Sequence, residues 1–170
     1  MDRIIKSFLD KFVKDFEIEN TKETTCFEYF CNYVIAQHEL TESFDYQDVN
    51  IGDNDTCGID GFILTINGHL IKTKDEIEDI IQISKNSEVK FVFIQSKTSP
   101  HFDLGEMEKF GLAVQDFLKE TPSLSWPANA QEKMELTSKI IEKFPEIKRN
   151  PSCVLYYITT GKWVDDITLG

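Results

Sequence analysis

The sequence feature that most constrains the fold is an apolar run, Val89-Lys90-Phe91-Val92-Phe93-Ile94, which ends in the polar triplet Gln95-Ser96-Lys97. Valine, isoleucine and phenylalanine favour β-strands, and a nearly continuous apolar run is typical of a strand buried on both faces of a sheet. Side chains of a strand alternate between its two faces, so Gln95 and Lys97 project from the same face. Burying a polar pair costs free energy, so we expect this pair to have a functional role.

A carboxylate, Asp60, lies in an earlier strand-like run, Gly58-Ile59-Asp60-Gly61-Phe62-Ile63-Leu64. If that run lies beside the 89–94 strand, an anion, an amide oxygen and an ammonium group converge at one place. Binding a hard cation beside a positioned water requires such a set of groups. The combination is typical of a metal-dependent nuclease.

Magnesium takes oxygen ligands and usually binds only one or two protein carboxylates. We therefore predict a Mg²⁺ or Mn²⁺ site in which Asp60 supplies a carboxylate, Gln95 its amide oxygen and Ser96 its backbone carbonyl. Lys97 would stand beside the nucleophilic water, where its charge favours hydroxide and stabilises the transition state. Glu28, at the edge of the apolar face of a predicted helix, is the fourth candidate, as a metal ligand or to orient water.

Each of these candidates also has a structural interpretation. Asp60 could be a partly exposed strand carboxylate, and Lys97 could extend into solvent or form an ion pair with Asp60. Glu28 could face solvent on its helix, and Glu39 competes for the same role. Asp53 and Asp55 are interpreted as turn-forming residues. The three histidines, His38, His69 and His101, are interpreted as structural, and for His101 a contact with phosphate stays open.

The composition is that of one domain of ordinary size, with 170 residues, 41% hydrophobic residues and 13 phenylalanines available for a core. No stretch approaches the roughly 18 consecutive apolar residues of a membrane span, and the N-terminus has no signal-peptide pattern. We therefore predict a cytoplasmic protein without membrane contact, and interpret residues 1–170 as a single nuclease-like domain at the N-terminus of a longer protein. The cysteines show no metal-binding spacing and are interpreted as buried free thiols: Cys26, Cys31, Cys57 and Cys153.

The formal net charge of −12 bears on how the chain could bind nucleic acid. It argues against a protein that coats nucleic acid through a broad basic surface, because contacts to phosphate dominate such affinity. An acidic domain can still hold nucleic acid at a metal-filled cleft, since a bound cation reverses the local electrostatics. The charge therefore leaves a metal-dependent nuclease open.

Periodicity predicts the order of the helices and strands. Apolar residues recur at three- and four-residue steps in five segments, which we predict to be helices: 3–16, 22–40, a short one at 74–84, 103–120 with Asp103 as its N-cap, and 130–144. Strands are predicted at 58–64, 69–72, 89–94 and 153–159, the last of them buried, with Asn67-Gly68 as a hairpin turn and 41–56 as a loop. The order is that of an α/β fold with mixed strand directions.

Two groups of motifs carry a resemblance to a known family. The first is Gly58-Ile59-Asp60-Gly61, a hairpin, a hydrophobic strand and Gln95-Ser96-Lys97 followed by a helix. This order resembles the PD-(D/E)XK nuclease superfamily, specifically its Mrr-like branch, in which glutamine replaces the usual acid. The region 27–163 is more closely similar to the N-terminal domain of AIPR abortive-infection phage-resistance proteins, in these segments: Asp53-Asn54-Asp55, Asp60-Gly61-Phe62, Phe93-Ile94-Gln95-Ser96-Lys97-Thr98-Ser99 with Phe102, and Tyr156-Tyr157-Ile158-Thr159-Thr160-Gly161-Lys162-Trp163.

The resemblance implies a restriction-endonuclease-like αβββαβ core, with a mixed central sheet flanked by helices. It places Asp60, Gln95 and Lys97 at the catalytic positions and Glu28 at the position of the helical acid. It also implies an endonuclease in bacterial anti-phage defence or restriction, with DNA as the expected substrate and a C-terminal region of the same protein for sensing or assembly. The neutral amide of Gln95 lowers the charge that holds the cation, so metal affinity is expected to depend on substrate phosphate.

Two other classes of function stay open. One is a catalytically inactive nuclease-fold module that binds nucleic acid or a partner protein, which the acidic charge and Gln95 favour. The other is a structural domain for oligomerisation, such as a homodimer, with Trp126 and Trp163 as exposed interface residues. Metal titration separates the inactive module from a nuclease, and light scattering tests the oligomer.

Overall fold

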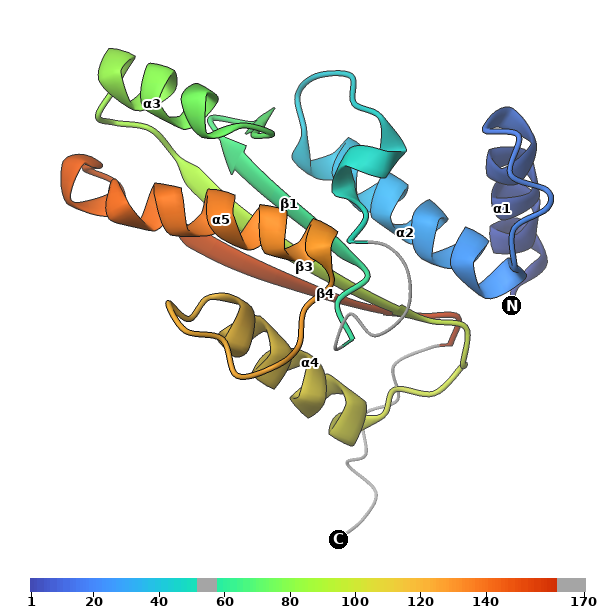
Figure 1. The fold of residues 1–170 in the computed structure, drawn as a ribbon. Coiled ribbons are helices and arrows are strands. Elements are labelled where there is room, and N and C mark those ends of the chain that lie inside the picture. The colour runs from blue at the N-terminus through green and yellow to red at the C-terminus, as the bar shows by residue number, and fades with distance from the viewer. Residues whose placement is uncertain (52–57, 162–170) are drawn as a thin grey trace, which may run out of the picture.

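The computed structural model describes residues 1–51 and 58–161 and has an α/β fold built on a four-stranded mixed sheet (Figure 1). The strands lie in the order β2-β1-β3-β4. Their bounds are β1 (Gly61–Ile66), β2 (His69–Leu70), β3 (Val89–Lys97) and β4 (Ser152–Thr159). β1 is antiparallel to β2 and β3, whereas β3 and β4 are parallel. The predicted α/β class and mixed strand directions are confirmed.

Helices cover both faces of this sheet (Figure 1). On one face lies α2 (Glu23–Glu39), on which α1 (Arg3–Asp15) packs. On the other face lie α4 (Leu104–Phe117) and α5 (Ala128–Glu142), with α3 (Lys74–Ile83) beside α5. Two short 3-10 helices complete the described elements, η1 (Tyr46–Val49) and η2 (Phe144–Glu146). All five predicted helices are confirmed, and none of the described helices is long and apolar enough to cross a membrane.

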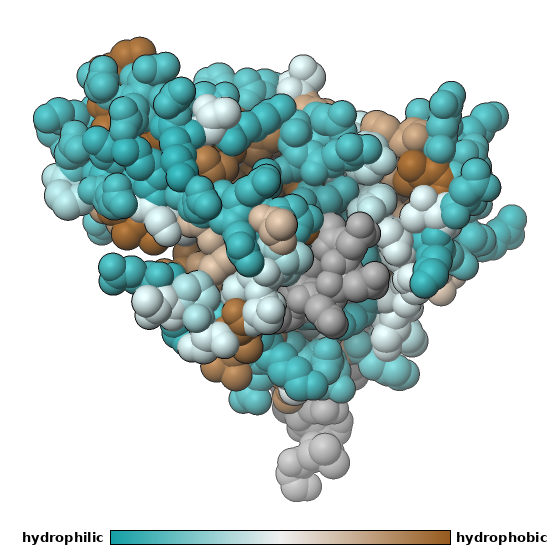
Figure 2. Space-filling view, in the orientation of Figure 1, coloured by the Kyte–Doolittle hydropathy of each residue, from teal (hydrophilic) through white to brown (hydrophobic). Residues whose placement is uncertain are grey.

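The apolar run of β3 is explained by its place between the two helical layers. Phe91 and Phe93 pack into the cluster under α4 and α5, whereas Val92 and Ile94 pack into the cluster under α2. A central strand that is covered on both faces has to be apolar at consecutive positions, as the sequence predicts. Figure 2 shows the surface of the α3, α4 and α5 layer that faces away from the sheet. This surface is largely hydrophilic, with apolar residues in small separate areas.

The Asn67-Gly68 turn is confirmed, but the strand that follows it is shorter than predicted. Asn67 and Gly68 have φ values of 56° and 82°, and Ile66 pairs with His69 across the turn. β2 ends at Leu70 because the chain then turns into α3, where the side chain of Glu76 accepts hydrogen bonds from the N–H groups of residues 72 and 73. These bonds form the start of α3 rather than a longer strand ladder.

β4 differs from the predicted buried strand. It pairs with β3 on one side only and lies at the edge of the described sheet, so its side chains are less covered than those of β3. Cys153 is exposed, and the prediction that it is a buried thiol is wrong. Cys26 and Cys31 are buried free thiols, as predicted, and Cys57 lies outside the described residues.

The connection between α4 and α5 is organised around the buried carboxylate of Asp116. It accepts hydrogen bonds from the backbone N–H of Ser123 (2.9 Å), the backbone N–H of Leu124 (2.9 Å) and the indole N–H of Trp126 (3.1 Å). These bonds, led by the one from Ser123, hold the pKa of Asp116 well below its usual range. The loop is therefore fixed by one ionised side chain.

Trp126 is consequently a core residue. Its ring packs edge-on against Phe117, with 5.4 Å between ring centroids, while its N–H reaches Asp116. The expectation that Trp126 is an exposed interface residue is wrong, because the loop folds it back over α4. Trp163, the other residue of that expectation, lies outside the described residues.

Candidate active site

Asp60 lies immediately before β1, at the end of the pairing between β1 and β3. Gly61 pairs with Ile94, so the next position of the same register places Asp60 opposite Gln95. The N–H of Asp60 donates to the carbonyl of Ile94 (2.8 Å). Its carboxylate accepts from the backbone N–H (2.6 Å) and the hydroxyl (3.2 Å) of Ser96. Asp60 is therefore fixed at the carboxyl end of β3, as the predicted site requires.

The two glycines that flank Asp60 allow a close approach of the chain to other residues. Gly58 has a φ of +86°, and a Cβ there would lie 2.6 Å from the amide nitrogen of Gln95. A Cβ on Gly61 would lie 2.6 Å from the amide carbon of Asn32. Larger residues would push both amides away from Asp60, which explains why this motif has glycine at both positions.

Asn32, on α2, holds the backbone at Asp60 and was not singled out from the sequence. Its side chain is fully buried and donates to the carbonyl of Asp60 (2.9 Å) and to the side chain of Asn50 (2.8 Å). A buried amide with two directed bonds fixes the backbone that carries the carboxylate. Only its position, four residues after Glu28 on the same helix, could have indicated this role.

Gln95 is 2% exposed, and its side-chain oxygen is buried without a hydrogen-bond partner among the described residues. Leaving such an oxygen unpaired costs about 1–3 kcal/mol, so a buried atom of this kind usually has a partner of another sort, such as a water or a cation. An amide oxygen opposite a carboxylate suits a hard cation. Asp60 and Gln95 therefore fit a Mg²⁺ or Mn²⁺ ion.

Groups of three or more histidine, cysteine, aspartate or glutamate side chains that could hold a metal do not occur among the described residues. Mg²⁺ does not need such a group, because it keeps several waters and binds one or two carboxylates. Ser96, whose carbonyl was predicted as a further ligand, uses its N–H and hydroxyl to hold Asp60. The candidate donors are therefore Asp60, Gln95 and the backbone carbonyl of Ser96, with Glu28 as a second carboxylate whose charge interacts with that of Asp60.

Glu28 lies close enough to Asp60 and Lys97 for their charges to interact. Burial, followed by the negative charge of Asp60, raises the pKa of Glu28 to about 7, while Lys97 lowers it. Burial likewise raises the pKa of Asp60, against hydrogen bonds from Ser96 and the charge of Lys97. Two acidic groups in one partly desolvated place repel each other, and a bound cation would relieve this repulsion.

Cys31 completes the face of α2 that is turned to the site. Burial raises the pKa of its thiol to about 12, the charges of Asp60 and Glu28 add to this, and hydrogen bonding to Ser96 opposes it. Cys31 is thus neutral and packs beside the hydroxyl that holds Asp60. The sequence pointed to a buried thiol but not to its place at the site, although its spacing of three residues from Glu28 puts both on one helical face.

Lys97 pairs with Glu106 on α4, with 3.4 Å between Nζ and Oε2, and its side chain is 37% exposed. The alternative ion pair between Lys97 and Asp60 is not formed. Glu106 also binds Lys109, at 2.8 Å. The sequence did not indicate Glu106, because α4 and β3 approach each other only in the folded chain.

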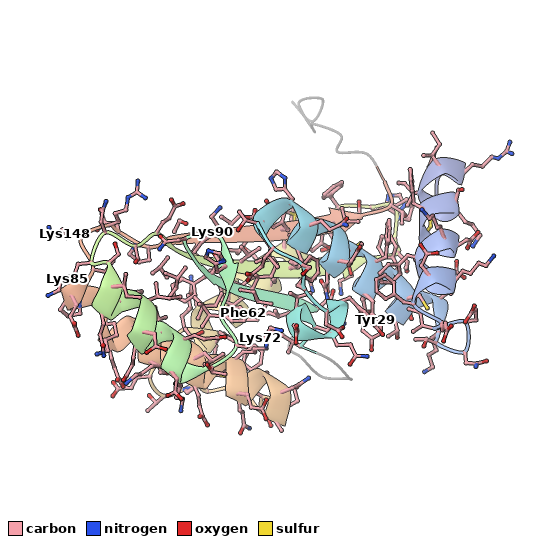
Figure 3. The ribbon with its side chains drawn as sticks, turned by 90° about the horizontal axis from the view of Figure 1, so that it is seen from above. Tyr29, Phe62, Lys72, Lys85, Lys90 and Lys148 are labelled. Atoms are coloured by element: carbon pink, nitrogen blue, oxygen red, sulfur yellow. The ribbon has the colours of Figure 1, made fainter. Side chains whose placement is uncertain are left out.

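Glu39, the competing helical acid, does not belong to this site. It binds Lys90 (2.9 Å) and the hydroxyl of Tyr156 (2.6 Å) near the other end of β3. In Figure 3, Lys90 lies toward one end of the sheet and Tyr29, the neighbour of Glu28, toward the other. Glu28 is therefore the only one of the two predicted helical acids near Asp60.

The remaining predicted candidates are not drawn into the site. His69 contacts Glu42, at 3.1 Å, on the β2 side of the sheet. His38 and His101 are exposed, and the structure gives neither a contact with the site. Asp53 and Asp55 lie outside the described residues.

Comparisons with known proteins return no match: no family model, no curated protein and no solved structure matches this chain. The resemblance to the PD-(D/E)XK superfamily therefore depends on the sequence motifs.

Replacing Glu28 with glutamine is expected to stabilise the metal-free protein at pH 8 more than at pH 5. In the parent, the pKa of Glu28 is about 7 in the folded protein and 4.5 in the unfolded chain. Between these pH values the unfolded chain is ionised at Glu28 while the folded protein keeps the proton, so the free energy of unfolding falls as the pH rises. Contact with solvent screens part of this effect, so we expect the Tm difference between variant and parent to grow by about 4 °C. Thermal melts in chelator at both pH values measure it.

The matched control is Glu23→Gln, since Glu23 lies in the same helix with its side chain 69% exposed. Its Tm difference from the parent should be the same at both pH values. An equal Tm difference for Glu28→Gln at pH 5 and pH 8 would show that Glu28 is not desolvated by the site.

Proposed function

We propose that this chain is a divalent-metal-dependent phosphodiesterase that cleaves nucleic acid, with DNA as the expected substrate, at the site formed by Asp60, Gln95, Lys97 and Glu28. The observation that carries the proposal is the buried, unpartnered amide oxygen of Gln95, a residue that the register of β1 and β3 places opposite Asp60. A carboxylate and an amide oxygen attract a hard cation, and an ammonium group beside them suits an anionic phosphodiester.

The element order supports a restriction-endonuclease-like αβββαβ core. α2, β1, β2, β3, α4 and β4 follow one another in that order, with α3 inserted before β3 and α5 added before β4. In this arrangement the candidate residues come from α2, from the start of β1 and from the end of β3. Fold by itself does not establish function, so the proposal depends on these side chains.

Each residue has a role in the proposed reaction, in which water attacks phosphorus in line. A bound Mg²⁺ or Mn²⁺ would neutralise phosphate charge and lower the pKa of a bound water. Asp60 and Gln95 hold the ion. Glu28, with a pKa of about 7, is suited to accept a proton from water at neutral pH. Lys97 stabilises the negative charge that develops on the phosphate oxygens.

The biological role that we propose is that of an effector in bacterial anti-phage defence or restriction, as the resemblance implies. In this role a C-terminal region of the same protein would be the partner that senses infection or directs assembly. An acidic nuclease domain is suited to such control, because its net charge of −12 keeps nucleic acid away until a metal and a partner are present.

A second candidate function is an inactive module of the same fold that binds nucleic acid or a partner protein. Two observations favour it: Gln95 adds no charge to hold a cation, and Lys97 is already neutralised by Glu106. Such a module would need neither a metal nor the proton acceptor at Glu28. Metal binding therefore separates the two functions.

The test combines a cleavage assay with a metal titration. The parent protein is expected to cleave DNA or RNA oligonucleotides with Mg²⁺ or Mn²⁺ and to stop when a chelator is added. Calorimetry with Mn²⁺ is expected to show tighter binding at pH 8 than at pH 6, because an ionised Glu28 adds negative charge beside Asp60 and so attracts the ion. Non-cleavable oligonucleotide should tighten binding further, since substrate phosphate supplies ligands.

The matched variants are Asp60→Asn, which keeps an acceptor for Ser96 but removes the charge, and Asp10→Asn on the exposed face of α1. Asp60→Asn should lose both cleavage and Mn²⁺ binding, whereas Asp10→Asn should keep both. If the parent neither cleaves nor binds Mn²⁺, with or without oligonucleotide, the inactive module is the correct function.

A further inference from the structure

β4 presents an open edge whose composition is unusual for this chain. Its eight residues, Ser-Cys-Val-Leu-Tyr-Tyr-Ile-Thr, carry no charge, no glycine and no proline, in a chain that is 28% charged. On the side away from β3, no further strand of the described part of the chain pairs with it. Natural proteins usually protect such edges with charges, proline, bulges or very short strands.

The opposite edge of the sheet is protected in these ways. β2 has only two residues, and the backbone N–H of Leu70 donates to the side chain of Glu42 (3.0 Å). A carboxylate that occupies an edge N–H prevents another strand from pairing there. The lack of protection at β4 is therefore specific to that edge.

The backbone groups that β4 directs outward follow from the bonds of β3. Ile94 and Ser96 bond toward Asp60, on the β1 side, so the alternate residues Gln95 and Lys97 bond toward β4. In a parallel pair a residue bonds to the two neighbours of its register partner, and the partner of Gln95 is Tyr157. The even-numbered residues of β4 therefore face β3.

The odd-numbered residues of β4 consequently direct their N–H and C=O groups away from the sheet, at Cys153, Leu155, Tyr157 and Thr159. Leu155 is near the middle of the strand and 44% exposed, and Cys153 is exposed as well. This edge thus offers main-chain hydrogen bonds together with apolar side chains, which is what an added β-strand recognises.

Charge decides which strand suits this edge. The basic residues just before β4 are Arg149, which pairs with Glu88, and Lys148, and a parallel copy of β4 would place the Lys148 residues of the two copies beside each other. An antiparallel copy would separate the two Arg149 residues by roughly 40 Å, because each is six residues from Leu155. It would also put no charge opposite any residue of β4.

We propose that β4 pairs antiparallel with β4 of a second copy of this chain, about a two-fold axis at Leu155, so that one sheet continues across two subunits. Outward-directed residues have to lie opposite one another, which pairs Leu155 with Leu155 of the partner subunit and Cys153 with Tyr157 of the partner subunit. A two-fold axis at Leu155 pairs residues 152–158 of the strand and places the exposed Leu155 side chains of the two subunits next to each other. Self-pairing of one edge gives a closed dimer.

The first test is cross-linking of the full chain with oxidised glutathione as the oxidant. The Leu155→Cys variant is expected to form a disulfide-linked dimer, because hydrogen-bonded antiparallel partners are about 5.5 Å apart at Cα, within the range of a disulfide. The parent is an internal control. Its two exposed Cys153 residues would lie four residues out of register, roughly 13 Å apart along the strands, and should not cross-link.

The second test is the oligomeric state by sedimentation across a dilution series. The parent is expected to be a dimer that tightens with salt, since each copy carries a charge of −12. Leu155→Lys places like charges opposite each other and should raise the dimer dissociation constant about 100-fold. Ile83→Lys, at an apolar residue of α3 that is 87% exposed, should leave it unchanged.

Three results would overturn the proposal. The first is a parent protein that stays monomeric, which would mean that another segment or protein covers the edge. The second is a dimer that Leu155→Lys does not weaken. The third is cross-linking through Cys153 rather than through position 155. Circular dichroism of each variant shows whether its sheet is intact, because the bonds between β3 and β4 do not involve the outward groups of Leu155.

Discussion

Lys97→Ala is expected to reduce nucleic-acid cleavage by about 10²–10³-fold or more while leaving the fold and Mn²⁺ binding in place. Lys97 supplies a positive charge that acts on both Asp60 and Glu28, and its loss removes stabilisation of the phosphate charge that develops in the transition state. Its side chain is partly exposed and its ion-pair partner is Glu106, so truncation leaves no buried charge unpaired. Single-turnover cleavage assays measure the effect.

Lys109→Ala is the matched control, because Lys109 binds the same carboxylate of Glu106 but is 73% exposed and outside the site. It should change cleavage little. If Lys97→Ala cleaves as fast as the parent, Lys97 is only a partner of Glu106 and the assignment of the site is wrong. The acid limb of the pH–rate profile for cleavage reports the ionisation of Glu28. Since Lys97 lowers the pKa of Glu28, Lys97→Ala should also move this limb to higher pH.

Asp116→Ala is expected to be the most destabilising of the substitutions considered, with a fall in Tm on the order of 10 °C. It leaves three donors without their acceptor, the N–H groups of Ser123, Leu124 and Trp126. The indole N–H of Trp126 is buried, and leaving a buried donor unpaired costs more than removing both partners of a hydrogen bond. Thermal unfolding followed by circular dichroism and by tryptophan fluorescence measures the loss.

The pH dependence of this effect has a defined sign. Because the pKa of Asp116 is lower in the folded protein than in the unfolded chain, its contribution is present above about pH 4 and is lost as the pH falls below that value. The difference between parent and variant should therefore shrink in acid. Asp10→Ala, on the exposed face of α1, should leave the Tm unchanged.

The helices and the hairpin could be predicted because their signals are local. The three- and four-residue spacing of apolar side chains gives α1, α2 and α5, and Asn67-Gly68 gives the turn between β1 and β2. The N-cap at Asp103, whose carboxylate accepts from the N–H of Glu106, could be predicted for the same reason. Each of these features depends on neighbours only a few residues away.

The failures concern burial, which neighbours in sequence do not fix. β4 reads as a buried strand because its composition is apolar, yet it lies at the edge of the described sheet. Trp126 was expected to be exposed, and it is buried because Asp116 draws the loop over α4. Strand order and loop packing decide both cases.

The candidate site divides in the same way. The position of Asp60 opposite Gln95 follows from strand alternation and register, so the sequence could indicate it. Asn32, Cys31 and Glu106 were not indicated, because they reach the site from helices that lie far from β3 in sequence.

By itself, the sequence of this protein determined which segments are helices and strands and which polar residues interrupt an apolar strand, because backbone geometry and hydrophobic periodicity act over a few residues. Only the tertiary structure decided that Glu28 rather than Glu39 lies beside Asp60, why the pKa of Glu28 is about 7, and which strand edge stays open. Burial, charge interaction and strand order depend on segments brought together from across the chain, and so they exist only once the chain has folded.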